Sequence, residues 1–287
     1  MFVIIGIVLV TIAVVGGFMM GGGHLILLIQ VAEFIIIIGA SIGGMFISAP
    51  FSVIKNLFAS IPKTMKSHHF SKQDYLELLK SFNDLFAIAQ RDGLLAIESH
   101  IENPDESEIL SKNTKFIKNN NAKSMFADTL RVLLLQGMNP FDLEALMDAE
   151  IKTVEIETQP IINLLSKTGD SMPGLGIVAA VLGIIVTMGS VSEGAEVVGH
   201  HVAAALVGTF LGVLFAYGYI NPLATNLEHL LEEKMQFLNT IKACILAFAK
   251  GNPPIITVEI ARRTINSDDR PSFSELENFI RGKKENS

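Results

Sequence analysis

The chain has 287 residues, of which 49% are apolar and 18% charged, with a mean hydropathy of +0.44 and a net charge of −7. This balance excludes an ordinary soluble domain and favours a protein that uses the bilayer as solvent. The acidic charge and the lack of a basic run argue against nucleic acid as a partner. Because Cys244 is the only cysteine, a disulfide framework is excluded, and we expect this residue to be a small core side chain.

Four apolar stretches are long enough to cross a hydrocarbon core of about 30 Å, which takes about 20 helical residues. They are Phe2–Met20, Leu25–Ile47, Gly174–Val191 and Val202–Asn221. The first is not interpreted as a signal peptide, because no basic residue precedes its apolar run and it leads directly into the second. Residues 1–48 are therefore predicted to form transmembrane helices 1 and 2, and residues 173–222 transmembrane helices 3 and 4.

The basic residues predict the orientation of these spans. All 22 Lys and Arg residues fall in two segments, 13 of them between Lys55 and Lys167 and nine between Lys234 and Lys284. The short connections at 21–24 and 192–201 contain none. By the positive-inside rule, residues 49–172 and 223–287 are cytoplasmic, and both termini lie in the cytoplasm.

The cytoplasmic segments have the pattern of helices. Ser71 followed by Asp74 resembles a capping box, and apolar residues then recur at helical spacing up to Gly93. A second helix is predicted at Ala122–Leu135 before a stop at Gly137, and a third begins at Pro140 and continues into the third span. We expect the Asn- and Lys-rich stretch 102–121 to be a loop.

After the fourth span, the helical period continues as far as Gly251. Strand-like alternation is absent from the sequence. The predicted fold class is therefore all-α, a polytopic membrane protein with four transmembrane helices and a helical cytoplasmic domain.

Small residues form a stripe on each of the last two spans, since they recur at spacings of three and four. The stripes are Gly176, Ala180, Gly183 and Thr187 on the third span, and Ala205, Thr209, Gly212 and Ala216 on the fourth. Gly208 and Gly212 also form a GxxxG pair, which lets helix backbones approach closely. Such stripes serve either helix packing or the lining of a pore.

Two prolines favour the pore. Pro173 opens the third span and Pro222 closes the fourth, so both are expected at the cytoplasmic mouth. At about 1.5 Å per residue, Thr187 and Thr209 each lie roughly 20 Å from these prolines, which places two hydroxyls at a similar depth along an ion pathway. The alternative is that each threonine only bonds the carbonyl four residues earlier.

Glu33, with Gln30 one turn before it, is the only ionisable side chain well inside a span. A charge at this depth must be protonated, paired or in water, so the residue is a functional candidate, although it could instead reach the outer interface. The third and fourth spans contain no Asp or Glu. If ions cross there, the carboxylate that carries them must come from a partner chain.

A set of short motifs occurs in a fixed order along nearly the whole chain. The motifs are Gly23-His24 with Gln30 and Glu33; Arg91-Asp92-Gly93-Leu94-Leu95 with Glu98; Glu144-Ala145-Leu146-Met147-Asp148; Gly169-Asp170-Ser171-Met172-Pro173 with Gly176-Ile177-Val178-Ala179-Ala180; Val207-Gly208-Thr209-Phe210-Leu211-Gly212; Tyr217-Gly218-Tyr219-Ile220-Asn221-Pro222; Arg270-Pro271-Ser272-Phe273; and Glu275-Leu276-Glu277. In order and spacing, they resemble the MotA family of flagellar stator subunits and, more distantly, the TolQ and ExbB energiser proteins.

This resemblance implies a non-enzymatic subunit in the lipid of the bacterial inner membrane. It implies a homo-pentamer around two copies of MotB, a single-span subunit that binds peptidoglycan and supplies the missing aspartate. Protonation and release of that aspartate would rotate the ring, whose cytoplasmic face pushes the rotor protein FliG. Arg91 and Glu98 match the charged rotor-binding positions, whereas Gln90 stands where many members have a basic residue. The other interpretation of Arg91 and Glu98 is an ordinary solvated helix face.

The resemblance also implies the proton as the coupling ion, with no bound cofactor. Sodium-driven relatives tend to have threonine at the position of Ala180 in addition to the one at Thr209. Na⁺ needs oxygen ligands to replace its hydration, whereas a proton travels on a carboxylic acid to which Thr209 need only offer a hydrogen bond. Thr187 or backbone carbonyls could still supply oxygen ligands.

Three other classes of protein are less consistent with the sequence. A TolQ- or ExbB-type energiser of a cell-envelope complex typically has three spans and an outer N-terminus. A metal site or membrane enzyme is disfavoured, because His68-His69 and His200-His201 are adjacent pairs that do not share a helix face, with no Cys/His cluster nearby. A structural scaffold would explain the small-residue stripes but not the two prolines.

Overall fold

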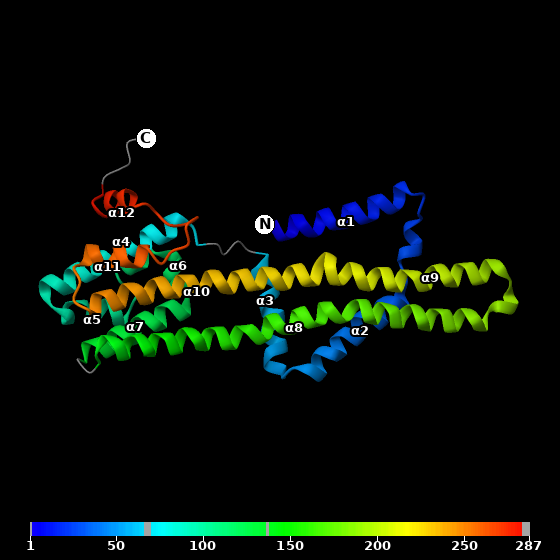
Figure 1. Cartoon of the computed structure of the whole chain (residues 1–287), viewed down its shortest axis with the longest axis horizontal. Helices are drawn as coiled ribbons and strands as arrows, with labels where there is room; N and C mark the ends of the chain where they lie inside the picture. The colour runs from blue at the N-terminus through cyan, green and yellow to red at the C-terminus, as the bar shows by residue number, and fades with distance from the viewer. Residues whose placement is uncertain (1, 66–69, 136–137, 283–287) are drawn as a thin grey trace. The chain divides into compact units, whose positions relative to one another are not determined.

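A computed structural model of the chain describes residues 2–65, 70–135 and 138–282, and these residues contain helices and no strand. The predicted all-helical class is confirmed for this part of the chain (Figure 1). His68, His69 and Gly137, which the sequence singled out, lie outside the described residues. By its contacts the chain divides into two compact units, Met1–His68 with Glu157–Leu230, and His69–Ile156 with Leu231–Ser287.

The first unit holds four helical stretches that are long and apolar enough to cross a membrane. They begin with α1 (Phe2–Met20) and with the 3-10 turn η1 (Leu25–Leu28) followed by α2 (Val31–Ser48). The third lies in α8 (Pro140–Gly189). The fourth starts with α9 (Ala195–Val213) and continues through a π-helical segment, η5 (Leu214–Ile220), into α10 (Asn221–Ala249). A 3-10 turn, η4 (Val191–Glu193), connects α8 to α9. The four predicted spans are confirmed as helices of sufficient length and apolarity.

The second span differs from the continuous helix expected at Leu25–Ile47. Its first turn is the 3-10 helix η1, and α2 begins only after Gln30, whose backbone is extended. The Gln30 Nε2 donates to the Leu27 carbonyl at 3.2 Å, which holds the side chain against η1 rather than on α2. Gln30 is therefore the N-cap of α2, three residues before Glu33, and its carbonyl accepts the N–H of Phe34 at 3.2 Å. A short helix after this span, α3 (Phe51–Thr64), was also missed.

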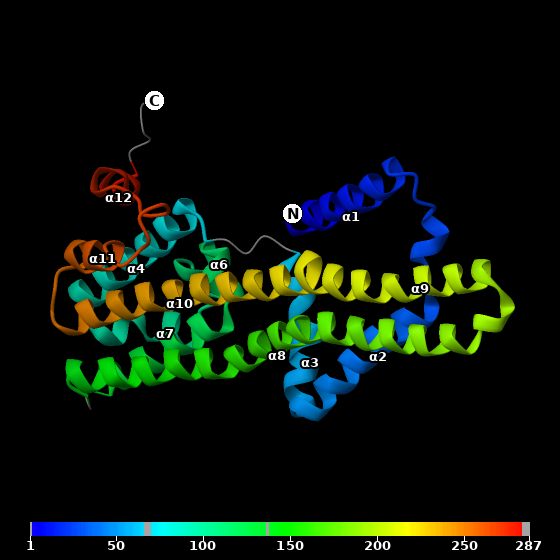
Figure 2. The same ribbon diagram turned by 45° about the vertical axis from the view of Figure 1, so that its right-hand side comes forward.

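Helix α8 packs antiparallel against α9 through glycines in the first unit (Figure 2). A Cβ on Gly176 would lie 2.7 Å from the Gly208 carbonyl oxygen, and a Cβ on Gly212 would lie 2.5 Å from that of Met172. Near the other end, a Cβ on Gly183 would lie 2.8 Å from the Cβ of Ala205. These contacts fix the register of the two helices, and they show that the glycines of both stripes serve close packing.

The π-helical segment η5 precedes Pro222. The backbone N–H of Asn221 donates to the carbonyl of Ala216, five residues earlier. Proline cannot donate and its ring crowds the carbonyl of the residue four before it, so a wider turn at this point relieves the clash without ending the helix. Helix α1 contacts this segment, where the Thr11 and Tyr219 hydroxyls lie 3.0 Å apart.

The described residues of the second unit form ten helical segments or parts of them. In addition to the first part of α8 and the last part of α10, they are α4 (Lys72–Asp92), η2 (Leu94–Ile97), α5 (Glu98–Glu102), η3 (Leu110–Lys112), α6 (Thr114–Lys118), α7 (Asn120–Leu134), α11 (Pro254–Arg262) and α12 (Phe273–Ile280), of which η2 and η3 are 3-10 turns. The predicted capping box is confirmed, because Ser71 and Asp74 bond each other's backbone N–H at the start of α4. The segments α11 and α12 were not predicted.

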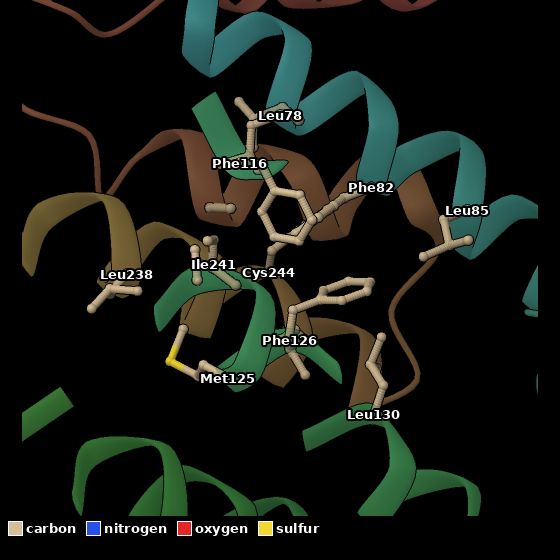
Figure 3. Close-up of a cluster of buried hydrophobic side chains, with 14 of the residues drawn as sticks. Leu78, Phe82, Leu85, Phe116, Met125, Phe126, Leu130, Leu238, Ile241 and Cys244 are labelled. Carbon is tan, nitrogen blue, oxygen red and sulfur yellow. The ribbon is translucent and has the colours of Figure 1, made fainter. Parts of the chain in front are cut away.

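Buried aromatic rings form the centre of this unit (Figure 3). Phe82 on α4 stacks on Phe126 of α7 at 5.0 Å between ring centroids and meets the edge of Phe116 at 5.7 Å. Cys244 of α10 is buried in the same cluster and unpaired, as expected for a core residue. Burial raises the pKa of its thiol, so the neutral form is favoured.

The expectation of a loop over 102–121 holds for residues 103–109 but was wrong for most of residues 110–121. This stretch contains η3, α6 and the start of α7. Asn113 accepts the N–H of Phe116 at 2.9 Å, and Asn119 accepts that of Ala122 at 3.2 Å, so both asparagines are N-caps. Asparagine favours both loops and N-caps, and the short helices between them gave no clear period.

The C-terminal segment is held to α4 by charged contacts. The Lys72 Nζ lies 3.1 Å from the Glu275 carboxylate, and the Lys80 Nζ donates to the Ile280 carbonyl at 3.3 Å. On α11, Arg262 and Arg263 both donate to Glu259, at 2.6 and 2.8 Å, and these bonds lower the pKa of Glu259 to about 2. The C-terminal segment is therefore folded as part of the second unit and is not a free tail.

Candidate functional site

The positions expected along an ion pathway lie on the packed faces of α8 and α9. Ala180 is buried and Thr209 is half-buried. In the register set by the glycines, Gly176 meets Gly208 and Gly212, and Ala179 meets Gly208. Thr209 is therefore level with Ala179 and Ala180, so these two positions lie at one depth.

Thr187 does not share that depth, and the expectation of two hydroxyls at similar depth was wrong. Because Gly183 meets Ala205, Thr187 lies beyond this pair and about eight residues, or ~12 Å, past the level of Thr209. The estimate from sequence assumed that Pro173 and Pro222 lie at the same depth. In the register of the structure, they lie at different positions along the helix axes. The Thr187 hydroxyl is buried and donates to the Gly183 carbonyl at 2.7 Å, which is the bond within one helix named as the alternative.

Neither proline ends a helix. Pro173 lies inside α8, and Pro222 is the second residue of α10, directly after the π-helical segment. Beside them, the Asn221 Nδ2 donates to the Asp170 carboxylate at 2.9 Å, and the Asn221 side chain lies where a Cβ of Gly169 would stand. A polar bond therefore joins the two helices next to their weakened turns.

Glu33 packs against both of the last two spans. It is in the first turn of α2, which packs against α9, and the residue is only 6% exposed. A Cβ on Gly208 would lie 2.6 Å from the Glu33 Oε2, and a Cβ on Gly183 would lie 3.6 Å from its Oε1. Among the residues that the structure describes, Oε2 has no hydrogen-bond partner.

The titratable groups of this region are few. The spans at 174–191 and 202–221 contain no Asp, Glu, Lys or Arg. In the described ranges, no group of three or more His, Cys, Asp or Glu side chains could hold a metal ion. The arrangement can therefore bind a proton at Glu33 or receive a carboxylate from another chain, and it offers no ligand set for a metal.

The two charged positions matched to rotor binding both lie on the surface of the second unit. Arg91 is at the end of α4 and Glu98 begins α5, with Gly93 at a φ of 91° between them. The Arg91 guanidinium bonds the neighbouring Asp92 at 2.7 Å, which lowers the pKa of that carboxyl. Leu95, which lies between Arg91 and Glu98 in the sequence, is 74% exposed. The surface around Arg91 and Glu98 therefore presents an apolar side chain as well as charges.

Gln90 faces a different environment from Arg91. It lines an open pocket with apolar neighbours that include Leu94, Leu133 and Phe248. Its side chain is nevertheless exposed, so it lies at the rim of this pocket. Gln90 is uncharged, and the neighbouring Arg91 provides a positive charge at this corner.

Two comparisons with family models cover most of the chain. Residues 4–93 match the model described as Motility protein A N-terminal, and residues 117–240 match the MotA/TolQ/ExbB proton channel family. Motility protein A of Salmonella typhimurium is 39% identical to this chain, over 98% of the chain and 95% of that relative. The chain belongs to the Motility protein A family. It is therefore a multi-pass membrane protein of a proton channel family, and not an enzyme.

Solved structures agree with this family assignment. The flagellar MotAB stator complex from Bacillus subtilis has a chain that matches with a TM-score of 0.72 and 25% identity, over 89% of this chain and 92% of that one. A chain of C. jejuni MotAB matches with a TM-score of 0.79 and 20% identity, over 94% of this chain and 98% of that one, and it supports the fold alone.

Sequence reasoning missed the bond between Asp170 and Asn221 and the burial of Glu33 between the spans. A signal for the first was available, because Asn221 directly precedes Pro222 and Asp170 lies three residues before Pro173. A signal for the second is the pair Gly183 and Gly208, which leaves space on two helices for a side chain from a third. Neither signal identifies its partner without the packing of the helices.

Proposed function

We propose that this chain is the membrane-embedded stator subunit of a bacterial flagellar motor, which couples proton flow to torque. The observation that carries this function is the match to Motility protein A over nearly the full length of both chains. A likeness to one chain of a flagellar stator complex over most of its length supports it further. Four helices able to span a membrane fit the stator better than a three-span energiser of the TolQ or ExbB type.

The pathway needs a carboxylate at the level of Ala180 and Thr209, because α8 and α9 carry none there. We propose that a single-span, MotB-like subunit with a peptidoglycan-binding domain supplies it as an aspartate. The Thr209 hydroxyl can donate to the ionised aspartate or accept from the protonated one, so it can follow both states. With a methyl group at Ala180 in place of a second hydroxyl, the site suits a proton better than Na⁺.

Torque requires that a conformational change at the level of Ala180 and Thr209 be transmitted to the cytoplasmic part of the chain. Helices α8 and α10 each have residues in both units, and they contain Pro173 and Pro222 respectively. Pro173 and Pro222 remove backbone donors, and the π-helical segment adds a second weak point. We propose that these turns bend when the partner's aspartate changes its protonation, and that the Arg91 and Glu98 corner then pushes the rotor protein FliG.

Exposed apolar surface on α8 supports assembly with further copies in the lipid. Ile177, Ile185 and Met188 are 56%, 61% and 67% exposed in the single chain. Such a face is stable only against lipid or another membrane helix. We propose a homo-pentamer around the partner in the bacterial inner membrane, with both termini in the cytoplasm as the basic residues predict.

Cross-linking in native membranes, followed by affinity purification of this chain, tests the function. The expected product contains a single-span protein with an aspartate in its span and a peptidoglycan-binding domain. Deletion of the gene should leave flagella that do not rotate. Capture of a single-span partner without a peptidoglycan-binding domain, together with normal motility of the deletion strain, would favour the energiser instead.

A further inference from the structure

The Glu33 carboxyl occupies a groove that three helices build around it. Its Oε2 lies where a Cβ of Gly208 would stand, and Ala179 closes the same space at 3.1 Å from that position. On the other side, Gly183 leaves room for Oε1. A Cβ at Gly208 would displace the carboxyl, whereas one at Gly183 would only touch Oε1 at 3.6 Å, so it is Gly208 that makes the room for this group.

No cation in the spans balances a charge at this place. The spans around Glu33 contain no Lys or Arg, and no described residue bonds its Oε2. An ionised carboxylate buried without a partner is costly in hydrocarbon, so the group is neutral unless a cation or a donor reaches it. A proton is the cation that a single carboxyl can hold without further ligands.

The groove lies at the depth of the proposed pathway. Gly208 directly precedes Thr209, and Ala179 directly precedes Ala180, so the Glu33 carboxyl is level with both pathway positions. The faces of α8 and α9 that meet it here carry no titratable group. Farther out, His201 lies on the same face of α9, seven residues or ~10 Å from Gly208, and its Nδ1 is buried without a described partner.

We infer that Glu33 is a proton-binding site of the pathway, loaded from the outer side past His201. The carboxylate takes one proton from a hydronium ion that enters past His201, which leaves a water molecule and the neutral acid. It then gives that proton to the next carboxylate, that of the partner chain, and is ionised again. This inference rests on the proposed function, because the acceptor belongs to the proposed partner.

Glu33→Gln separates proton binding from packing. Glutamine has the shape of the neutral acid but cannot release a proton, so a packing role predicts unchanged function. We expect the variant to reach wild-type levels in the membrane and to bind the partner normally. Rotation of beads at low load should be slower by about tenfold or more, since a positioned proton-transfer group typically contributes roughly 10²–10⁴-fold. Its speed should also lose much of its dependence on external pH.

Glu196→Gln is the matched control, because Glu196 is exposed in the first turn of α9. Motors with this variant should rotate beads at the wild-type speed. A His201→Gln variant shows whether His201 causes the pH dependence of the rotation speed. If Glu33 is the proton-binding site, the speed of this variant should still depend on external pH. The position of the carboxyl has its own test. Gly208→Ala should destabilise the purified complex in the wild-type background and much less in Glu33→Ala, where the clash with Oε2 is gone.

Glu33→Gln beads that rotate within twofold of the wild type at every external pH would overturn the inference. Equal destabilisation by Gly208→Ala in both backgrounds would overturn the geometry on which it stands. If the wild-type chain itself fails to restore rotation to cells that lack a stator, the proposed function fails first. The two failures are therefore distinguishable by the wild-type control.

Discussion

Gly212→Ala tests whether the close contact of α8 and α9 sets the register of the pathway. The added Cβ would lie 2.5 Å from the Met172 carbonyl oxygen and 2.9 Å from the Gly176 Cα, both of them backbone atoms that cannot rotate away. Ordinary contact begins at 3.4 Å, so the helices must separate by about 0.9 Å. Overpacking of this kind costs about 1–3 kcal/mol. The same substitution gains up to ~1 kcal/mol in helix propensity.

Gly174→Ala provides the matched control on α8, because a Cβ there meets nothing within 4 Å. It receives the propensity gain without the clash, so the difference between the two variants isolates the packing term of about 1–3 kcal/mol. Thermal unfolding of the purified protein in detergent, followed by circular dichroism, measures that difference. If Gly212→Ala unfolds at the same temperature as Gly174→Ala, the helices are not held by this contact, and the depths assigned to Ala180 and Thr209 lose their basis.

Reversing both Arg91 and Glu98 should impair swimming while membrane levels and partner binding stay normal, because exposed charges contribute little to folding; normal swimming would place the rotor contact elsewhere. Glu259→Gln should destabilise α11 by about 1–3 kcal/mol, because it weakens the bonds to Arg262 and Arg263. Hydrogen exchange of α11 should then be faster, and unchanged exchange would show that these bonds contribute nothing. Since the folded pKa of Glu259 is lowered from 4.5 to about 2, that stability is present above pH 4.5 and is lost as the pH falls toward 2. A reporter fused at Glu196 should be external and one within 103–121 cytoplasmic, and an internal reading at Glu196 would remove the four-span topology.

The sequence predicts the spans well because the bilayer imposes a simple requirement, about 20 apolar residues without charge. Phe2–Met20 is predicted to the residue for this reason. The break before α2 could not be predicted in the same way, since Leu25–Leu28 is as apolar as the helix that follows. The extended backbone of Gln30 and the bond from its side chain to Leu27 separate the two segments.

Periodicity identifies the faces of α8 and α9 but not their axial offset. The spacing of Gly176, Gly183 and Gly212 indicates which faces of the two helices meet. The register depends on which residue of the other helix packs against each glycine, and the spacing does not give that. For that reason Thr187 was placed level with Thr209, about two turns from its true position. The burial of Glu33 has the same origin, because its neighbours come from helices far away in the sequence.

The coupling ion tests the account most directly. Tethered cells whose only stator contains this chain should rotate in medium without sodium, and a protonophore should stop them. This result follows from a pathway that has the methyl group of Ala180, and not a second hydroxyl, at the level of Thr209. Rotation that scales with external sodium and survives the protonophore would contradict a proton-driven stator.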